Sequence, residues 1–276
     1  MSIAKKRLRF LSPKQRNPKA PLFVFLPGMD GTGHLFSQQL PGLKALFDIR
    51  CLSIPPDDLT CWQGLIEQVA NLIALEQKQA AARPIYLCGE SFGGCLALQL
   101  AAYFPQWCDH LILVNPASSF NRQPWMSWGA TAAQWLPDSL YKLSTWGLLP
   151  FLIVPERVSR STCRSLLRAM QFVTPTTAAW RLSLLREFAI EELPLRNIEQ
   201  SVLVIAGAAD RLLPSGAEAE RLVKYLPQAK KTILPNSGHA CLLEQDIKLV
   251  EILRSQRFLL PNLKVNKNAP YLHPHC

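Results

Sequence analysis

Residues 84–98 read PIYLCGESFGGCLAL, and they give the clearest indication of the fold. Its first part, Pro84–Cys88, is a continuous apolar run of strand length, and an apolar helical pattern follows over 92–104. Between them lies the turn GESFG, with Ser91 at its centre. A serine on so sharp a turn sits in strained backbone, so the flanking Gly89 and Gly93 meet a steric need. The stretch predicts Ser91 as a nucleophile at the end of a buried strand; an ordinary serine in a glycine-rich turn is the alternative.

Apolar runs of strand length recur along the chain, and helical patterns separate them. The expected strands are 21–27, 48–54, 84–88, 111–115, 201–206 and 231–234, with 7–11 as a candidate antiparallel edge strand. The expected helices, each with an apolar face, are 60–79, 92–104, 217–226 and 242–255. Most strand runs are continuous instead of alternating, which is typical of a sheet covered on both faces. The pattern predicts an α/β fold with a mostly parallel, doubly wound sheet.

One segment, 118–195, contains no convincing strand and interrupts this alternation. It holds ten of the 24 aromatic residues of the chain. We expect an inserted helical cap over the carboxyl edge of the sheet, in which Trp125, Trp128 and Trp146 bind a long apolar chain. The alternative is that these aromatic side chains only pack the cap. The predicted organisation is a basic arm (1–20), a core in two parts (21–117 and 196–258), the cap (118–195) and a C-terminal tail (259–276).

A second glycine-rich loop follows the strand expected at 21–27. Residues 27–33 read PGMDGTG and match no phosphate-binding pattern. In a strand–serine–helix arrangement, a backbone N–H from this loop completes an oxyanion hole with the N–H that follows the serine. We assign these donors to Met29 and Phe92, and we expect Gly28 and Asp30 to contact the substrate. A loop turn without a function is the alternative.

A nucleophilic serine needs a base, and the base needs a carboxylate that orients it. His239 lies in the small-residue turn NSGHA after the strand expected at 231–234, and Asp210 follows the strand expected at 201–206. Because parallel strands end at one edge of the sheet, both residues are expected beside Ser91. Helix capping is the alternative role for Asp210. Glu244 is the second choice for the acid, although its position within an expected helix favours a surface role.

The formal net charge of +10 is concentrated at the two ends of the chain. Residues 1–19 carry seven Lys and Arg residues and residues 255–276 carry three, with no acid in either segment. The remainder is formally neutral, which argues against a nucleic-acid-binding core. The basic arm predicts a salt-sensitive contact with an anionic membrane, with a disordered solubilising arm as the alternative.

Four arginines of the expected cap are regularly spaced. Within the cap, arginines recur at spacings of 3, 4 and 4, which predicts a stripe on one face of a single helix: Arg157, Arg160, Arg164 and Arg168. Such a stripe is either a solvated face or a surface for the phosphates of a lipid, coenzyme A or an acyl-carrier protein.

The cysteines show no CxxC pair and no metal-ligand spacing, so we expect no metal or other cofactor. The basic N-terminus is not followed by an apolar region with a cleavage site, and no segment has the pattern of a transmembrane helix, so a cytoplasmic location is expected.

Three segments together resemble a known family. PGMDGTG at 27–33, PIYLCGESFGGCLAL at 84–98 and LILVNPASSF at 111–120 are similar to the hydrolase-like half of plant phytyl ester synthases, within the α/β-hydrolase superfamily, and the resemblance extends over about residues 7–258. It implies a serine acyl-enzyme and substrates with long acyl chains or phytol. The plant proteins carry a second, acyltransferase-like half with an HxxxxD motif, which we do not expect in this chain, because His34, His110 and His239 are followed five residues on by Gln39, Asn115 and Glu244. Any acyl transfer is therefore expected to run through Ser91.

The sequence thus predicts a serine hydrolase that acts on lipid-like esters. It is expected to be an esterase or lipase, or an acyltransferase to an alcohol such as phytol. A small-molecule hydrolase or lyase of the same fold, as in quinone biosynthesis, stays an alternative that a polar pocket beneath the cap would favour. A non-catalytic binding module is a further alternative, but binding alone would not need a complete set of serine, aspartate and histidine. The oligomeric state is left open.

Overall fold

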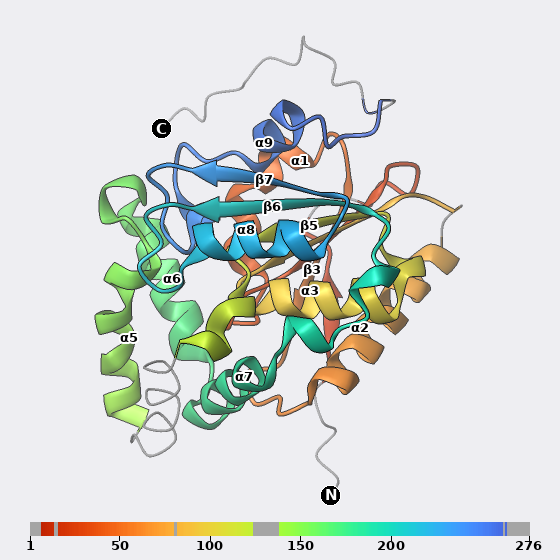
Figure 1. Ribbon diagram of the computed structural model, residues 1–276. Coiled ribbons are helices and arrows are strands. Elements are labelled where there is room, and N and C mark those ends of the chain that lie inside the picture. Colours follow the sequence, from red (N-terminus) through yellow and green to blue (C-terminus); the bar gives the residue numbers. More distant parts are fainter. Residues whose placement is uncertain (1–6, 14–15, 80–81, 124–137, 262, 264–276) are drawn as a thin grey trace, which may run out of the picture.

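A seven-stranded sheet forms the centre of the computed structural model, which describes residues 7–13, 16–79, 82–123, 138–261 and 263 (Figure 1). The strand order is β1-β3-β2-β4-β5-β6-β7. β1 pairs antiparallel with β3, and all the other neighbouring pairs are parallel. The strands are β1 (Arg9–Leu11), β2 (Leu22–Leu26), β3 (Asp48–Ser53), β4 (Ile85–Glu90), β5 (His110–Val114), β6 (Ser201–Gly207) and β7 (Ala229–Leu234). This arrangement confirms the predicted α/β fold and its antiparallel edge strand.

Helices and short 3-10 turns connect the strands. The α-helices are α1 (Leu40–Leu43), α2 (Trp62–Lys78), α3 (Phe92–Tyr103), α5 (Asp138–Leu152), α6 (Arg160–Phe172), α7 (Pro175–Glu187), α8 (Ser215–Tyr225) and α9 (Leu249–Ser255). The 3-10 turns are η1 (His34–Gln38), η2 (Pro105–Trp107), η3 (Ala117–Arg122), η4 (Pro155–Arg157), η5 (Ile190–Glu192), η6 (Leu195–Asn197) and η7 (Cys241–Leu243). Among the described helices, none has the length and apolarity needed to cross a bilayer.

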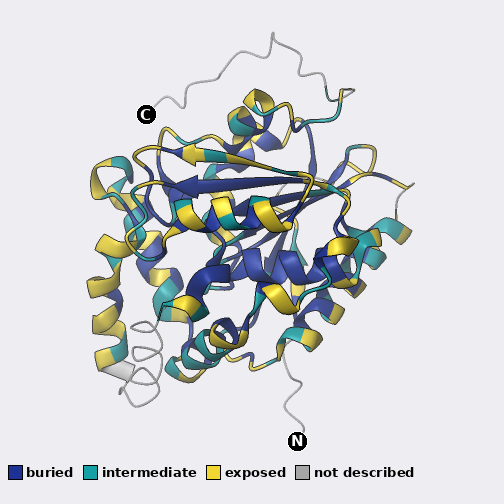
Figure 2. Ribbon diagram, viewed as in Figure 1, coloured by how far each residue is buried: buried dark blue, intermediate teal, exposed yellow. Residues whose placement is uncertain are grey.

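Both faces of the five inner strands, β2 to β6, are buried, which explains their continuous apolar runs in the sequence. Because side chains alternate along a strand, Leu22 and Val24 of β2 pack into the cluster that contains α2, α3 and α8. Phe23 and Phe25 point the other way, into the cluster that contains α1 and α9. Figure 2 shows the central strands buried along most of their length between these helical layers.

The described part of the segment 118–195 is helical, and its helices α5 and α6 lie at the edge toward which β6 and β7 run (Figure 1). Several of its aromatic side chains join it to the core: Trp180 Nε1 donates to the Thr60 carbonyl at 3.1 Å, and Phe188 packs against Trp62 with ring centroids 5.9 Å apart. Trp146 on α5 is 58% exposed, and its contact with an apolar chain stays a prediction. Trp125 and Trp128 lie outside the described residues.

Two expectations about helices are wrong. The segment 242–255 is not one helix: η7 ends at Leu243, and α9 begins only at Leu249. The chain turns there because the Glu244 carboxylate faces the core instead of solvent. In the core the carboxylate accepts hydrogen bonds from the His239 loop. The four cap arginines also do not share one helix, because α6 begins at Arg160 and Arg157 belongs to the preceding turn η4.

Parts of the basic arm are held on the body of the protein. Arg9 lies in β1, and Arg16 forms an ion pair with Glu76 of α2 at 3.1 Å. Residues 1–6 and 14–15 lie outside the described residues. A contact of this arm with an anionic membrane stays a prediction.

Candidate active site

The nucleophile position is a tight turn between β4 and α3. Strand β4 extends two residues further than expected, to Glu90, and α3 begins at Phe92. Ser91 between them has φ 53° and ψ −114°, a conformation that costs a residue with a side chain on the order of 1–3 kcal/mol. The turn is held in place because the Ser91 N–H donates to the Val114 carbonyl at 3.0 Å, and the Ser91 carbonyl accepts from the Gly94 N–H at 2.9 Å.

The two glycines of the turn have no room for a side chain. A Cβ atom on Gly89 would lie 2.2 Å from the Gly93 carbonyl oxygen. A Cβ atom on Gly93 would lie 2.1 Å from the Leu26 carbonyl oxygen, at the end of β2. Both oxygens belong to the backbone, so neither can move away by a rotation of a side chain. The close approach of α3, β4 and β2 therefore requires glycine at these positions.

The structure brings Ser91, His239 and Asp210 into one hydrogen-bonded chain. His239 Nε2 lies 2.9 Å from Ser91 Oγ, and His239 Nδ1 lies 2.8 Å from Asp210 Oδ2. These residues come from the loops after β4, β7 and β6, at the same edge of the sheet. The side chains of His239 and Asp210 are 4% and 1% exposed. In this arrangement the histidine can take the serine proton while the carboxylate orients the ring.

The electrostatics of the pair keep Asp210 ionised. Burial alone would raise the pKa of Asp210, but His239 and the hydrogen-bond donors around the carboxylate hold this pKa below its ordinary value. These donors are the Ser215 hydroxyl and the backbone N–H groups of Leu212 and Leu213. For His239, burial lowers the pKa, but the carboxylates of Asp210 and Glu90 raise it above its usual range.

The loop after β2 passes directly beside Ser91. A Cβ atom on Gly28 would lie 3.7 Å from Ser91 Cβ. The N–H of Phe92 is the first of α3, and within the described residues neither it nor the N–H of Met29 donates to a protein acceptor. Both donors are therefore free for a developing oxyanion. Asp30 faces its own loop, where its Oδ2 accepts from the Thr32 N–H at 2.9 Å.

A cap residue that the sequence did not reveal holds this loop. Arg181 of α7 is 2% exposed, and its guanidinium donates to the Met29 carbonyl at 2.6 Å and to the Pro55 carbonyl at 3.1 Å. It approaches so closely that a Cβ atom on Gly31, which has φ 65°, would lie 2.8 Å from Arg181 Nη1. The cap thereby positions the loop that carries the Met29 N–H.

Two buried polar residues support the His239 loop, and their roles were not predicted. Asn115, with φ 41° at the end of β5, donates to the carbonyls of Gly238 and His239 at 3.0 and 2.6 Å and accepts from the Gly207 N–H at 2.8 Å. Glu244 accepts from Ser237 Oγ and from the Gly238 N–H, each at 2.8 Å. Both side chains are fully buried, so the expected surface role of Glu244 is wrong. Glu244 orients the loop of the base and does not contact His239 as its acid.

Glu90 is a second carboxyl group at the site that sequence reasoning missed. Its Oε1 is buried and has no hydrogen-bond partner within the described residues. Burial raises the pKa of Glu90 to about 7, with His239 acting in the opposite direction. Glu90 therefore titrates near neutral pH beside the candidate base.

Replacing Glu90 with glutamine is expected to shift the acid limb of the pH–rate profile to lower pH. The Glu90 carboxylate raises the pKa of His239, and His239 must be neutral to accept the Ser91 proton. Without the carboxylate the imidazole loses its proton at a lower pH, so kcat/KM reaches its plateau earlier as the pH rises. Profiles of kcat/KM against pH for E90Q and for the exposed control E251Q test this. An acid limb that stays in place in E90Q, or moves to higher pH, would count against the assignment.

The described residues contain no group of three or more His, Cys, Asp or Glu side chains that could hold a metal ion.

The comparisons with known proteins agree with one another on the fold. A family model described as "Alpha/beta hydrolase family" matches residues 23–252. Phytyl ester synthase 1, chloroplastic, from Arabidopsis thaliana is 33% identical over 258 residues, which are 85% of this chain and 36% of that protein. Phytyl ester synthase 2, chloroplastic, from the same plant is 30% identical over 296 residues, 96% of this chain and 42% of that protein. The chain thus spans less than half the length of these two relatives.

The structure of MenH from S. aureus is similar in fold. It superposes with a TM-score of 0.71, covering 92% of this chain and 100% of that one, at 15% identity.

Proposed function

The chain belongs to the alpha/beta hydrolase family, and on that premise we propose that it is a serine hydrolase that forms an acyl-enzyme at Ser91 with long-chain lipid esters. One observation carries the proposal: Ser91 Oγ, His239 and Asp210 form a continuous hydrogen-bonded chain at the end of β4, with distances of 2.9 and 2.8 Å. The order serine, aspartate, histidine along the chain is the order that this fold uses.

The first half of the reaction forms the acyl-enzyme. Ser91 Oγ attacks the ester carbonyl carbon while its proton passes to His239 Nε2. The backbone N–H groups of Met29 and Phe92 donate hydrogen bonds to the carbonyl oxygen and stabilise its negative charge. As the intermediate collapses, His239 returns the proton to the leaving alcohol, and the acyl group stays on Ser91 as an ester.

The second half transfers the acyl group to an acceptor. A water molecule or an alcohol gives its proton to His239 and attacks the acyl carbonyl. The products are a free fatty acid or a new ester, and Ser91 regains its proton from His239. Asp210 is held ionised, so it stabilises the imidazolium that exists in both halves.

The long-chain substrate class is supported by similarity and by the cap. The two plant relatives that cover most of this chain are named phytyl ester synthases. The cap also exposes large apolar side chains on α5 and α6, among them Leu143, Phe151 and Phe172. Apolar groups of this size suit contact with an acyl or prenyl chain.

Incubation of the purified protein with a labelled acyl-lipid, with and without phytol, tests the proposal and identifies the acceptor. We expect labelled product that requires Ser91: phytyl ester if phytol is the acceptor, or free fatty acid if water is. The S91A variant gives the background in both arms. The thermal transition shows whether the wild-type protein is folded. If the folded wild type forms neither product, the proposed substrate class is overturned.

A further inference from the structure

The loop of residues 27–33, called the oxyanion loop below, is joined to the cap through α7. The Gly31 N–H donates to the Gly28 carbonyl at 3.0 Å, which closes a turn around Met29. The Met29 carbonyl accepts from the Arg181 guanidinium of α7 at 2.6 Å. The residue that supplies the proposed oxyanion donor is therefore also the residue that the cap holds.

Fixing the Met29 carbonyl restricts the direction of the Met29 N–H. Each residue has only two soft backbone dihedrals, because the peptide units on both sides of it are planar. The far end of the turn is fixed as well, since the Ile54 N–H donates to the Gly31 carbonyl at 2.7 Å. With its own carbonyl held by Arg181, Met29 has little freedom to reorient its N–H.

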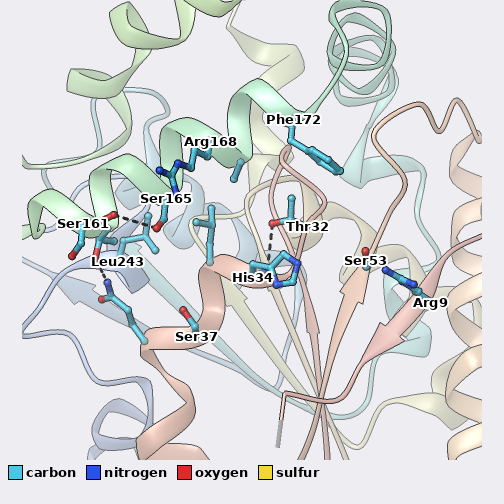
Figure 3. Close-up of a pocket in the computed structure, with 14 residues that line it drawn as sticks. Arg9, Thr32, His34, Ser37, Ser53, Ser161, Ser165, Arg168, Phe172 and Leu243 are labelled. Carbon is cyan, nitrogen blue, oxygen red and sulfur yellow. Dashed lines mark hydrogen bonds between the residues drawn. The ribbon is translucent and has the colours of Figure 1, made fainter. Parts of the chain in front are cut away.

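The cap approaches the oxyanion loop from a second side, but there a groove separates them. About 670 Å³ lies between α6 and the end of the loop, with Thr32 and His34 on one wall and Arg168 on the other (Figure 3). An open groove does not fix a loop by packing. Among the described side chains of the cap, the hydrogen bonds to the oxyanion loop come from Arg181 alone.

The position of Arg181 is costly, which argues for a specific role. Its side chain is 2% exposed, and within the described residues its guanidinium forms no ion pair. The carboxyl groups of Asp30 and Asp58 act on it only from a longer range, where they oppose the lowering of its pKa by burial. A buried charge needs hydrogen-bond partners. Arg181 finds them in the carbonyls of Met29 and Pro55, at 2.6 and 3.1 Å.

Other contacts attach α7 to the body of the protein without touching the oxyanion loop. Trp180 Nε1 donates to the Thr60 carbonyl at 3.1 Å, and Trp62 Nε1 donates to the Leu184 carbonyl of α7 at 2.9 Å. The attachment of α7 thus does not depend on Arg181 alone. A change at Arg181 can therefore release the loop while the helix stays in place.

We propose that Arg181 is a positioning residue for the chemical step. By holding the Met29 carbonyl it keeps the Met29 N–H directed at the developing oxyanion, so the oxyanion hole is complete only while α7 of the cap is docked. This inference rests on the proposed function, and it adds to it a cap residue that acts through Met29 and not on the substrate itself. Its loss should slow the reaction without weakening substrate binding.

The test compares R181Q and R181K with the matched control W180F. R181Q removes the charge and the forked donor, whereas R181K keeps the charge and offers a single ammonium group. W180F removes one hydrogen bond to a backbone carbonyl from the neighbouring residue of the same helix. Hydrolysis of a p-nitrophenyl ester gives kcat and KM, and hydrogen–deuterium exchange of the peptide with the oxyanion loop reports on loop order. The thermal transition reports on the fold.

We expect R181Q to lower kcat by about 10²-fold with KM within about threefold, because a displaced donor stabilises the oxyanion poorly while the substrate binds as before. R181K should recover about tenfold of this loss, because its charge is kept. The amides of the oxyanion loop should exchange about tenfold faster in R181Q and at the wild-type rate in W180F. If R181Q does not fold, the same comparison is made between R181K and W180F, and kcat should fall in R181K only.

A change confined to KM, a loss of kcat that W180F shares, or unchanged exchange of the oxyanion loop in R181Q would overturn the inference. The exchange measurement needs no active enzyme, so it separates this inference from the proposed function. A wild type that hydrolyses no ester, with a loop that R181Q loosens, would overturn the proposed function and support the hold of Arg181 on the loop.

Discussion

Replacing Ser91 with alanine is expected to lower kcat for ester hydrolysis by about 10⁴-fold or more without loss of the fold. The Oγ atom is the nucleophile of the proposed mechanism, and its only hydrogen-bond partner among the described side chains is His239. Alanine removes one oxygen that makes no second hydrogen bond with a described residue. Steady-state hydrolysis of a p-nitrophenyl ester gives the rate, and the thermal transition reports on the fold.

The matched control is S119A. Ser119 is also buried, and its hydroxyl has no hydrogen-bond partner within the described residues. Its replacement removes the same atom without touching the candidate site, so activity should stay at the wild-type level. Retention of substantial activity in S91A, or an equal loss in S119A, would contradict the assignment of the nucleophile.

Replacing Gly93 with alanine is expected to destabilise the protein by about 2–4 kcal/mol and to reduce kcat/KM by about 10²-fold or more. The new Cβ would lie 2.1 Å from the Leu26 carbonyl oxygen and 2.5 Å from that of Pro27. To make room, either α3 or the end of β2 must move. These two segments carry the proposed oxyanion donors Phe92 and Met29, so the loss of stability and the loss of rate have one cause.

Gly216 offers a control at the same position of another helix. It is the second residue of α8, as Gly93 is the second of α3, and a Cβ atom on it would meet no atom within 4 Å. Alanine there should stabilise the helix by about 0.5–1 kcal/mol, because glycine loses more backbone entropy on folding. Chemical denaturation of both variants gives the two free energies. A G93A protein with the wild-type midpoint and activity would show that the turn does not need glycine.

The features that the sequence predicted well depend on local pattern. The parallel strands lie within about two residues of their expected ends, because continuous apolar runs identify strands that are buried on both faces. Ser91, His239 and Asp210 meet as expected, because each follows a strand and parallel strands end at one edge. This topological rule needs no knowledge of side-chain packing.

The features that it missed depend on contacts between distant segments. In the sequence, Asn115 looks like an ordinary residue at a strand end, and Glu244 looks like a surface residue of a helix. Only the folded chain shows that both form hydrogen bonds with the loop of His239. Arg181 resembles any cap arginine until its guanidinium is seen to hold the Met29 carbonyl. A regular spacing of arginines likewise could not reveal that a turn separates Arg157 from α6. Buried polar residues need hydrogen-bond partners, and here those partners come from distant segments that a local sequence pattern does not reveal.

The central claim is that Ser91 carries the acyl group, and covalent labelling tests it most directly. The purified protein is treated with a fluorophosphonate, and its intact mass and peptide map are measured beside those of S91A. We expect one adduct per chain, located on the peptide that contains Ser91 and absent from the variant. A folded wild-type protein that takes up no label, or takes it up at another residue, would contradict the assignment of Ser91 as the nucleophile.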